Sequence, residues 1–280
     1  MRRETFETPG EVVLDLRLPE GSIEVEAVDG TTTEIELESR GSDDEARELL
    51  DDARIDVRES QHGHEVIVHV GDLRRPGFAF WRKADLRLTI RTPPGASLRV
   101  ETASADLRGR GRLGSLDAKC ASGDVELDEL AADAAVGTAS GDVNLRIVGG
   151  AADISTASGD VGLGRVGGEV AVRTASGDIA VQDAAGAVKI RTASGDQRIG
   201  AVAAGSVELQ SMSGDISVGI RQGSNVWVDA RAMSGDLRSE LDLGESPPTD
   251  ESGPLVELKA SSMSGDIEVV RAPARAELTR

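Results

Sequence analysis

Hydrophobic and polar residues alternate along most of this chain, and beyond residue 106 the alternation recurs with a fixed period. The period is marked by the motif Ser-Gly-Asp, whose aspartates lie 18 residues apart from Asp124 through Asp196. A variant of the motif at Asp106 begins the series. Three further copies follow at steps of 19, 21 and 30 residues, at Asp215, Asp236 and Asp266. Self-similarity at a fixed period is typical of repeat architectures.

The repeats carry the same apolar columns when they are aligned on their aspartates. The position directly after the aspartate is occupied by Val125, Val143, Val161 and Ile179. A later column holds Val136, Ile154, Val172 and Ile190. Polar or small residues such as Arg173 and Lys189 stand between the apolar ones, and this period of two predicts strands with one buried face. Glycine pairs such as Gly167-Gly168 interrupt each repeat midway, so a repeat reads as strand, turn, strand, turn.

These columns predict an all-β fold, a parallel β-solenoid (β-helix) with coils of about 18 residues. In such a fold residue n lies against residue n+18 of the next coil, about 4.8 Å away. One coil cannot fold alone, because burying a few small apolar side chains does not offset the entropy of ordering 18 residues. A meander of antiparallel hairpins is the second interpretation, but a meander does not need the same residue in every column.

The first third of the chain is interpreted as degenerate coils. Residues 21–30 match the frame of residues 159–168, and Leu98, Val100 and Thr102 are in register with the second strand of a coil. We predict degenerate N-terminal coils with insertions and a cap over residues 1–97, regular repeats over 98–270, and a C-terminal cap or tail over 271–280. Residues 42–53 have a polar N-cap and an acidic first turn, which predicts one short helix in an insertion.

Two insertions interrupt the pattern. The segment 71–83 contains Phe78, Phe80 and Trp81, three of the five aromatic residues. This cluster is a candidate partner-binding patch, or else a cap that covers one end of the solenoid. Residues 242–254 are predicted to form an acidic loop, and residues 271–280 to protect the last edge from strand addition.

Composition and charge exclude several functions. The net charge of −19 argues against nucleic-acid binding and against attraction to an anionic membrane. A single cysteine excludes an internal disulfide framework. We find neither a signal peptide nor an apolar run long enough to span a membrane. We therefore expect a cytoplasmic protein without direct membrane insertion, with envelope association through a partner as an option.

The Ser-Gly-Asp corner is the obvious candidate site, and we interpret it as a structural turn in which glycine supplies a positive φ and aspartate bonds to nearby amides. The corner residues are Gly123, Asp124, Gly141, Asp142, Gly159, Asp160, Gly177, Asp178, Gly195 and Asp196. The alternative is calcium binding by the aspartate row, although the Gly-Gly-x-Gly-x-Asp frame of calcium-binding β-rolls is missing.

No other pattern indicates chemistry. Thr138, Thr156, Thr174 and Thr192 form a column that predicts a hydrogen-bonded ladder, and Cys120 occupies the same column, which indicates a structural thiol. His62, His64 and His69 lack the further ligands of a metal site and are expected to be solvated. The sequence contains no nucleophile-elbow motif of hydrolases, no phosphate-binding loop and no zinc-protease motif. We expect no catalytic residue, cofactor or metal, so the protein is not expected to be an enzyme.

The run Thr-Ala-Ser-Gly-Asp-Val/Ile at Thr138, Thr156 and Thr174 resembles the bacterial putative-adhesin family of β-strand-repeat proteins, which contain a domain of unknown function. Residues 18–25 and 92–96 are similar to that family as well. The resemblance covers nearly the whole chain and implies a bacterial β-solenoid, with a link to the cell envelope or its stress response. It transfers no catalytic residue.

Three functions are consistent with these observations. The first is a non-catalytic scaffold or adhesin-like protein that presents solenoid faces and the aromatic segment to unknown protein partners. The second is a cytoskeletal solenoid that self-associates end to end into polymers. The third is a surface adhesin that calcium stabilises.

Overall fold

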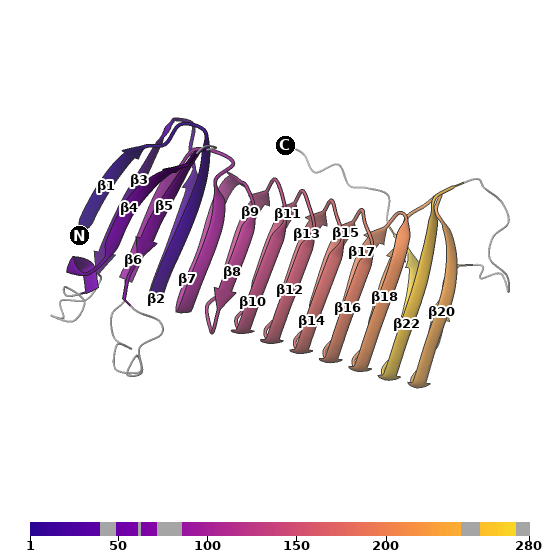
Figure 1. Cartoon of the computed structure of the whole chain (residues 1–280). Helices are drawn as coiled ribbons and strands as arrows, with labels where there is room; N and C mark the ends of the chain where they lie inside the picture. Colours follow the sequence, from indigo (N-terminus) through magenta and orange to yellow (C-terminus); the bar gives the residue numbers. More distant parts are fainter. Residues whose placement is uncertain (40–48, 61–62, 72–85, 242–252, 273–280) are drawn as a thin grey trace. The chain divides into compact units, whose positions relative to one another are not determined.

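The computed structural model describes residues 1–39, 49–60, 63–71, 86–241 and 253–272 (Figure 1). Twenty-three strands are found in this part of the chain. The chain divides into two compact units, residues 1–147 and residues 148–280. Repeated coils occur in each unit, which confirms the predicted all-β solenoid.

Ten of the described strands lie wholly in the first unit, and an eleventh, β11, ends one residue beyond it. They are β1 (Arg2–Glu7), β2 (Glu11–Ala27), β3 (Thr32–Ser39), β4 (Arg54–Ser60), β5 (Gly63–His69), β6 (Leu86–Thr92), β7 (Ser97–Leu113), β8 (Leu116–Cys120), β9 (Val125–Leu130), β10 (Ala134–Ser140) and β11 (Val143–Val148).

The strands of the second unit alternate between the two sides of successive coils. They are β12 (Ala152–Ser158), β13 (Val161–Val166), β14 (Val170–Ser176), β15 (Ile179–Ala184), β16 (Val188–Ser194), β17 (Gln197–Val202), β18 (Gly205–Ser213), β19 (Ile216–Ile220), β20 (Asn225–Ser234), β21 (Leu237–Ser239), β22 (Leu255–Ser264) and β23 (Ile267–Arg271).

Each regular coil of the second unit contains two strands, and parallel pairing joins a strand to its counterpart in the adjacent coil. Val172 of β14 pairs with Ile190 of β16, and Val161 of β13 pairs with Ile179 of β15. Both pairs are 18 residues apart, so the predicted stacking of residue n on residue n+18 is confirmed for these coils.

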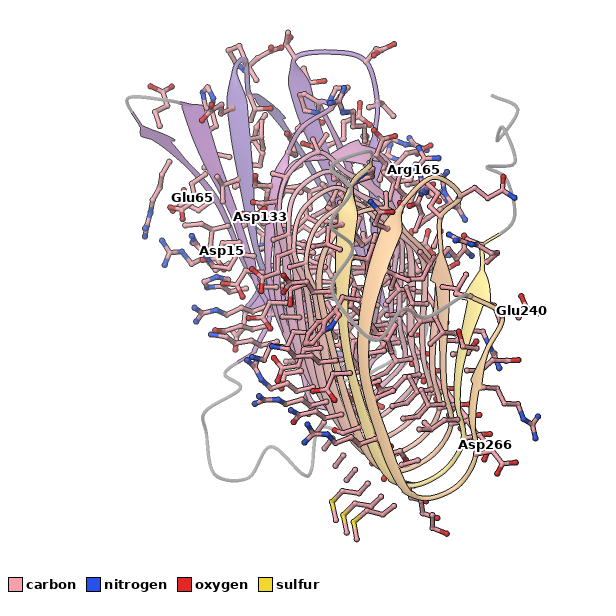
Figure 2. The ribbon with its side chains drawn as sticks, turned by 90° about the vertical axis from the view of Figure 1, so that its right-hand side faces the viewer. Asp15, Glu65, Asp133, Arg165, Glu240 and Asp266 are labelled. Carbon is pink, nitrogen blue, oxygen red and sulfur yellow. The ribbon has the colours of Figure 1, made fainter. Side chains whose placement is uncertain are left out.

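The core is built from the predicted apolar columns. Val172 and Ile190 have no exposed surface, whereas Arg173, which follows Val172 in the alternation, is exposed. Aliphatic side chains from both strands of a coil meet inside, which explains why a chain with so few aromatic residues can fold. In Figure 2 the labelled ionic side chains, such as Asp266 and Glu240 of the second unit, point outward from the ribbon.

In the first unit, β2 and β7 are single strands that run through a whole coil. β2 pairs in parallel with β7 on one side, and on the other side with β5 along its first half and β6 along its second half. Ile23 pairs with Leu107, which in turn pairs with Val125. The degenerate coil read from residues 21–30 therefore has the expected register.

Three strands of the first unit depart from the purely parallel arrangement expected from the columns. β4 pairs antiparallel with β5, β3 with β6, and β1 with β3. Only residues 61 and 62 lie between β4 and β5, and so short a connection can join strands only in antiparallel orientation. The 18-residue repeat is absent from this part of the sequence, so it could not indicate the antiparallel pairing.

The coils at the end of the second unit do not stack in sequence order. β18 pairs with β22, and β22 pairs with β20. On the other side of the coil, β19 pairs with β23 and β23 with β21. The coil formed by β22 and β23 is therefore inserted between two coils that precede it in sequence. The stacking order of these coils therefore differs from their order along the chain.

Several predicted features lie partly or wholly outside the described residues. Leu49, Leu50 and Asp51 are helical, and they belong to the helix predicted at 42–53. The aromatic cluster, residues 242–252 of the acidic loop, and residues 273–280 of the tail lie outside the described part. The described end of the tail segment, Arg271, belongs to β23, which is not an outermost strand.

Within the described ranges, no helix is both long and apolar enough to cross a lipid bilayer.

Candidate functional site

The glycine of the Ser-Gly-Asp corner lies so close to the neighbouring coil that no side chain fits. A Cβ atom on Gly177 would lie 2.2 Å from the carbonyl oxygen of Gly159, and one on Gly195 would lie 2.2 Å from that of Gly177. These glycines also have positive φ angles, 149° at Gly159, 134° at Gly177 and 129° at Gly195. The corner thus requires glycine for its backbone conformation and for its contact with the adjacent coil.

The prediction that each corner glycine supplies a positive φ angle is wrong for two glycines of the first unit. Positive φ angles are not found at Gly123 and Gly141. A Cβ atom on Gly141 would nevertheless lie 2.2 Å from the carbonyl oxygen of Gly123, and one on Gly123 would lie 2.0 Å from that of Ala105. The reason for glycine at these two positions is steric, because the coils approach each other through their backbones.

The corner aspartates bond from coil to coil. The backbone N–H of Asp178 donates to Oδ1 of Asp160 over 2.8 Å, and that of Asp196 donates to Oδ1 of Asp178 over 2.9 Å. In the first unit the N–H of Asp142 donates to Oδ1 of Asp124 over 2.9 Å. These charge-assisted bonds offset the repulsion between carboxylates in the row. One oxygen of each acceptor is therefore already engaged by a backbone amide.

The described residues contain no group of three or more His, Cys, Asp or Glu side chains placed to hold a metal ion. The aspartate row presents its carboxylates one per coil along the corner. Metal ligands must instead converge on a single point, and calcium takes six to eight oxygen atoms.

Two threonines of the column, Thr174 and Thr192, bond within their own coil and not along the stack. Oγ1 of Thr174 donates to the carbonyl of Ser176 over 3.0 Å, and Oγ1 of Thr192 donates to that of Ser194 over 3.1 Å. In these two coils the hydroxyl group holds the strand end to the corner that follows it. Oγ1 of Thr138 and Oγ1 of Thr156 are buried without a hydrogen-bond partner among the described residues, so the four threonines do not form the predicted ladder.

Cys120 pairs in register with Thr102 on one side and Thr138 on the other, in the column where it was predicted. Its side chain is buried. Burial raises the pKa of the Cys120 thiol, and a hydrogen bond with Thr102 opposes that shift only in part. The thiol therefore stays protonated at neutral pH and is a poor nucleophile.

The predicted partner-binding residues Phe78, Phe80 and Trp81 lie outside the described residues, as does His62. His69 was expected to be solvated, but its Nε2 lies 3.1 Å from Oδ1 of Asp15, and only 21% of the side chain is exposed. Asp15, which is labelled in Figure 2, is on β2 and His69 is on the adjacent β5. We interpret the pair as a cross-strand contact that joins these two strands.

The most unusual surface feature is a row of methionines at the corners of the last coils in the second unit. Met212, Met263 and Met233 occupy the position that Ala157 and Ala175 hold in earlier coils. Their exposed fractions are 58%, 51% and 82%, in the order in which their coils stack. Figure 2 shows a row of sulfur atoms at the lower end of the ribbon.

A shallow groove lies beside this methionine row on the side formed by β14, β16, β18 and β22. Its lining includes Arg173, Arg191, Gln210, Met212 and Met263. The side chains of Arg173 and Arg191 are 56% and 47% exposed. The groove therefore places two guanidinium groups next to two thioether side chains.

The arginines of the groove are only partly neutralised. Arg191 Nη2 lies 3.3 Å from Oε1 of Glu208, and Arg173 Nη1 lies 3.6 Å from Oδ1 of Asp153. A hydrogen bond from Lys189 is the main cause that lowers the pKa of Glu208. Free donors remain on both guanidinium groups, and these groups match carboxylates in geometry and charge. The groove can bind an anionic group beside an apolar one, and it contains no arrangement for nucleophilic or acid–base catalysis.

Sequence reasoning missed the groove and its methionines. The signal was present, because Thr-Ala-Ser-Gly-Asp changes to Ser-Met-Ser-Gly-Asp or Ala-Met-Ser-Gly-Asp in the last three copies. A large apolar residue replaces alanine at a position that alternation places on the outside. The pairing of the strands was needed to show that the three methionines are adjacent.

Comparison of the chain with known proteins assigns it to a described family. The family model Toastrack DUF4097 matches residues 13–270. No curated protein matches the chain. Similar solved structures include a putative adhesin from Bacteroides fragilis NCTC 9343, at 14% identity and a TM-score of 0.41, with 96% of each chain covered. A putative lipid binding protein from Parabacteroides distasonis ATCC 8503 shares 11% identity at a TM-score of 0.36, again with 96% of each chain covered. Similarity at this level does not bear on function.

Proposed function

Because the chain belongs to the Toastrack DUF4097 family, whose members are β-solenoids, we propose that it is a non-catalytic, adhesin-like scaffold that presents one solenoid surface to a protein partner. The observation that carries this proposal is the groove between Arg173, Arg191 and the methionine row. It combines apolar and cationic side chains on a rigid stack of strands, as a binding surface for a polypeptide requires.

The methionines supply the apolar part of this surface. Isolated apolar side chains on a surface are normal, but a contiguous apolar row marks an interaction site. Methionine is flexible and polarisable, so it adapts to partner side chains of different shapes. Alanine in the same column of earlier coils fits the corner equally well. The corner turn itself therefore does not require the change to methionine.

The arginines define the partner further. Arg173 and Arg191 lie in the same column of adjacent coils, so the groove favours a segment with carboxylates spaced along the stack. The net charge of −19 disfavours contact with an anionic lipid surface. We therefore assign an acidic protein segment with apolar side chains as the ligand of the groove. Any association of this chain with the cell envelope would then occur through the partner that carries this segment.

Site-specific photo-crosslinking in cells tests the proposal. A photoreactive residue is placed at position 212 or 263, inside the groove, and in a matched variant at position 157, which is exposed in the same column but three coils away from position 212. We expect one and the same partner to be captured from positions 212 and 263. Position 157 should not capture it.

A charge variant separates specific binding from adhesion to an apolar surface. Arg191→Glu should abolish the crosslink from position 212, because it opposes a carboxylate with a carboxylate. Arg146→Glu, which changes an exposed arginine outside the groove, should leave it intact. Equal capture from positions 157 and 212, or capture that ignores Arg191→Glu, would contradict the proposal.

A further inference from the structure

The stack of coils in the second unit ends in an apolar surface that no described strand covers. β20 pairs with β22 and has no partner on its other edge among the described strands. Val226 and Val228 point to the interior of the coil but are only half-buried. Their neighbours Val256 and Leu258 on β22 have no exposed surface. The inner face of β20 therefore lacks the cover that a further coil gives elsewhere.

The second strand of the same coil is uncovered in the same way. Leu237 of β21 is 54% exposed, whereas Ile267 and Ile216, which precede it in the column, are each 1% exposed. The carboxylate row also ends here, because Asp236 donates its N–H to Asp266 and no further coil follows it in the described stack. Backbone groups and apolar side chains are thus open at one end, which is a template for strand addition.

The sequence of β20 is complementary to itself when it is read in the opposite direction. Its outward residues are Trp227, Asp229, Arg231 and Met233, symmetric about Ala230. In an antiparallel pair centred on Ala230, residue i of one copy faces residue 460 − i of the other. Asp229 then faces Arg231 of the second copy, and Trp227 faces Met233. Opposite charges and methionine–aromatic pairs both stabilise cross-strand neighbours.

We propose that β20 is a dimerisation edge, which pairs antiparallel with β20 of a second copy of this chain about a two-fold axis at Ala230. An isologous contact of this kind closes after two subunits, because the same edge of each copy is used in the contact and is no longer open to a third copy. The pairing extends the sheet across the axis and covers the half-buried inner face of β20. This inference rests on the edge strand and not on the groove lined by Met212 and Met263, although Met233 belongs to both the edge and the methionine row, and it goes beyond the proposed function.

A competing explanation is that Asp229 and Arg231 merely protect an exposed edge. Within one copy they already form an ion pair, with Arg231 Nε 3.2 Å from Oδ1 of Asp229. Charged edge residues do discourage pairing between chains. That explanation predicts a monomer, and it gives no reason for the symmetric placement of Trp227 and Met233.

Light scattering on the full chain, with a concentration series, tests the proposal. We expect a dimer of about twice the 29.2 kDa chain mass. Asp229→Arg should raise the dimer Kd at least about tenfold, because two pairs of like charges then face each other across the axis. The double variant Asp229→Arg/Arg231→Asp restores opposite charges across the axis and should restore the dimer. The melting curve of each variant verifies that it is folded.

Cysteine crosslinking tests the register. Ala230→Cys places one thiol on the axis, opposite its own copy, and should form a covalent dimer under mild oxidation. Ala232→Cys is the matched control, because residue 232 faces residue 228 of the second copy and its thiols lie too far apart to join. The native Cys120 is buried and provides no crosslink of its own.

The outcomes that overturn the proposal are distinct. A monomer at the highest concentration would show that the edge does not associate, and open-ended polymers would show a contact that does not close. A dimer that Asp229→Arg leaves unchanged, or one that the charge swap fails to restore, would use another surface. Equal crosslinking of Ala230→Cys and Ala232→Cys would refute the register and the two-fold axis.

Discussion

The backbone N–H of Asp266 donates a hydrogen bond of 2.8 Å to Oδ1 of Asp215, a residue 51 positions earlier in the chain. The N–H of Asp236 in turn donates to Oδ1 of Asp266. The carboxylate row therefore runs Asp215, Asp266, Asp236, which shows directly that the last coil in sequence is inserted one place before the end of the stack. As a result the edge of the stack is β20, and Met263 lies between Met212 and Met233.

The assignment of strand residues to the inside or the outside of the coil can be tested at two adjacent positions. Val172→Asp should lower the free energy of unfolding by at least about 3 kcal/mol, because it buries a charge without a partner. Arg173→Asp should change it by no more than about 0.5 kcal/mol, since Arg173 is exposed. Denaturant titration measures both. Similar losses in the two variants would mean that the inside and outside of the strand are misassigned.

The close approach of coils at the corner predicts a large cost for the smallest substitution. Gly177→Ala should destabilise by about 2 kcal/mol or more, because its Cβ would overlap the carbonyl oxygen of Gly159 and the φ angle is unfavourable for alanine. Gly137→Ala is the control, since no atom lies within 4 Å of its Cβ. The control should be neutral or slightly stabilising. A fully stable Gly177→Ala variant would refute the steric argument.

The role of the corner carboxylate is tested by a pair of substitutions at Asp178. Asp178→Ala should cost about 1 kcal/mol, because the Asp196 N–H then loses the acceptor of its solvent-exposed hydrogen bond. Asp178→Asn keeps an oxygen at the same place and should retain most of the stability. If both variants lost the same amount, the carboxylate charge and not the hydrogen bond would be the important property.

Calcium dependence follows from the same row. We expect the melting temperature to be unchanged by added calcium or by a chelator, because one oxygen of each acceptor carboxylate is bonded to an amide and the row does not converge. A melting temperature that rises with calcium concentration would instead favour the calcium-stabilised adhesin, since a ligand that binds only the folded state stabilises it.

Cys120 should react with thiol reagents far more slowly in the folded protein than in the unfolded chain. Burial raises its pKa, so at a given pH less of the reactive thiolate is present when the protein is folded. The folded-state rate should continue to rise with pH after the rate of the unfolded chain has levelled off. Equal rates with and without denaturant would show that the thiol is accessible.

The candidate surfaces could be predicted only in part. The corner and the threonine column were evident, since the same residue recurs every 18 positions. Adjacent methionines were not evident, because Met233 and Met263 are 30 residues apart with another segment between them. The contact between His69 and Asp15 could not be predicted either, as it depends on the pairing of β2 with β5 outside the regular repeat.

The sequence by itself determined the coil: its length, its two strands, the residues that face inward, and the register of residue 172 on residue 190. These properties follow from alternation and from identical columns, which depend only on a coil and its immediate neighbour. Tertiary structure decided the order of the last coils and the antiparallel pairing of β1, β3 and β4. Identical columns allow any coil to stack on any other, so the columns cannot select one order. The stacking order is selected by the connections between coils and by the apolar surfaces that each coil must bury. Both are set only when the chain is folded.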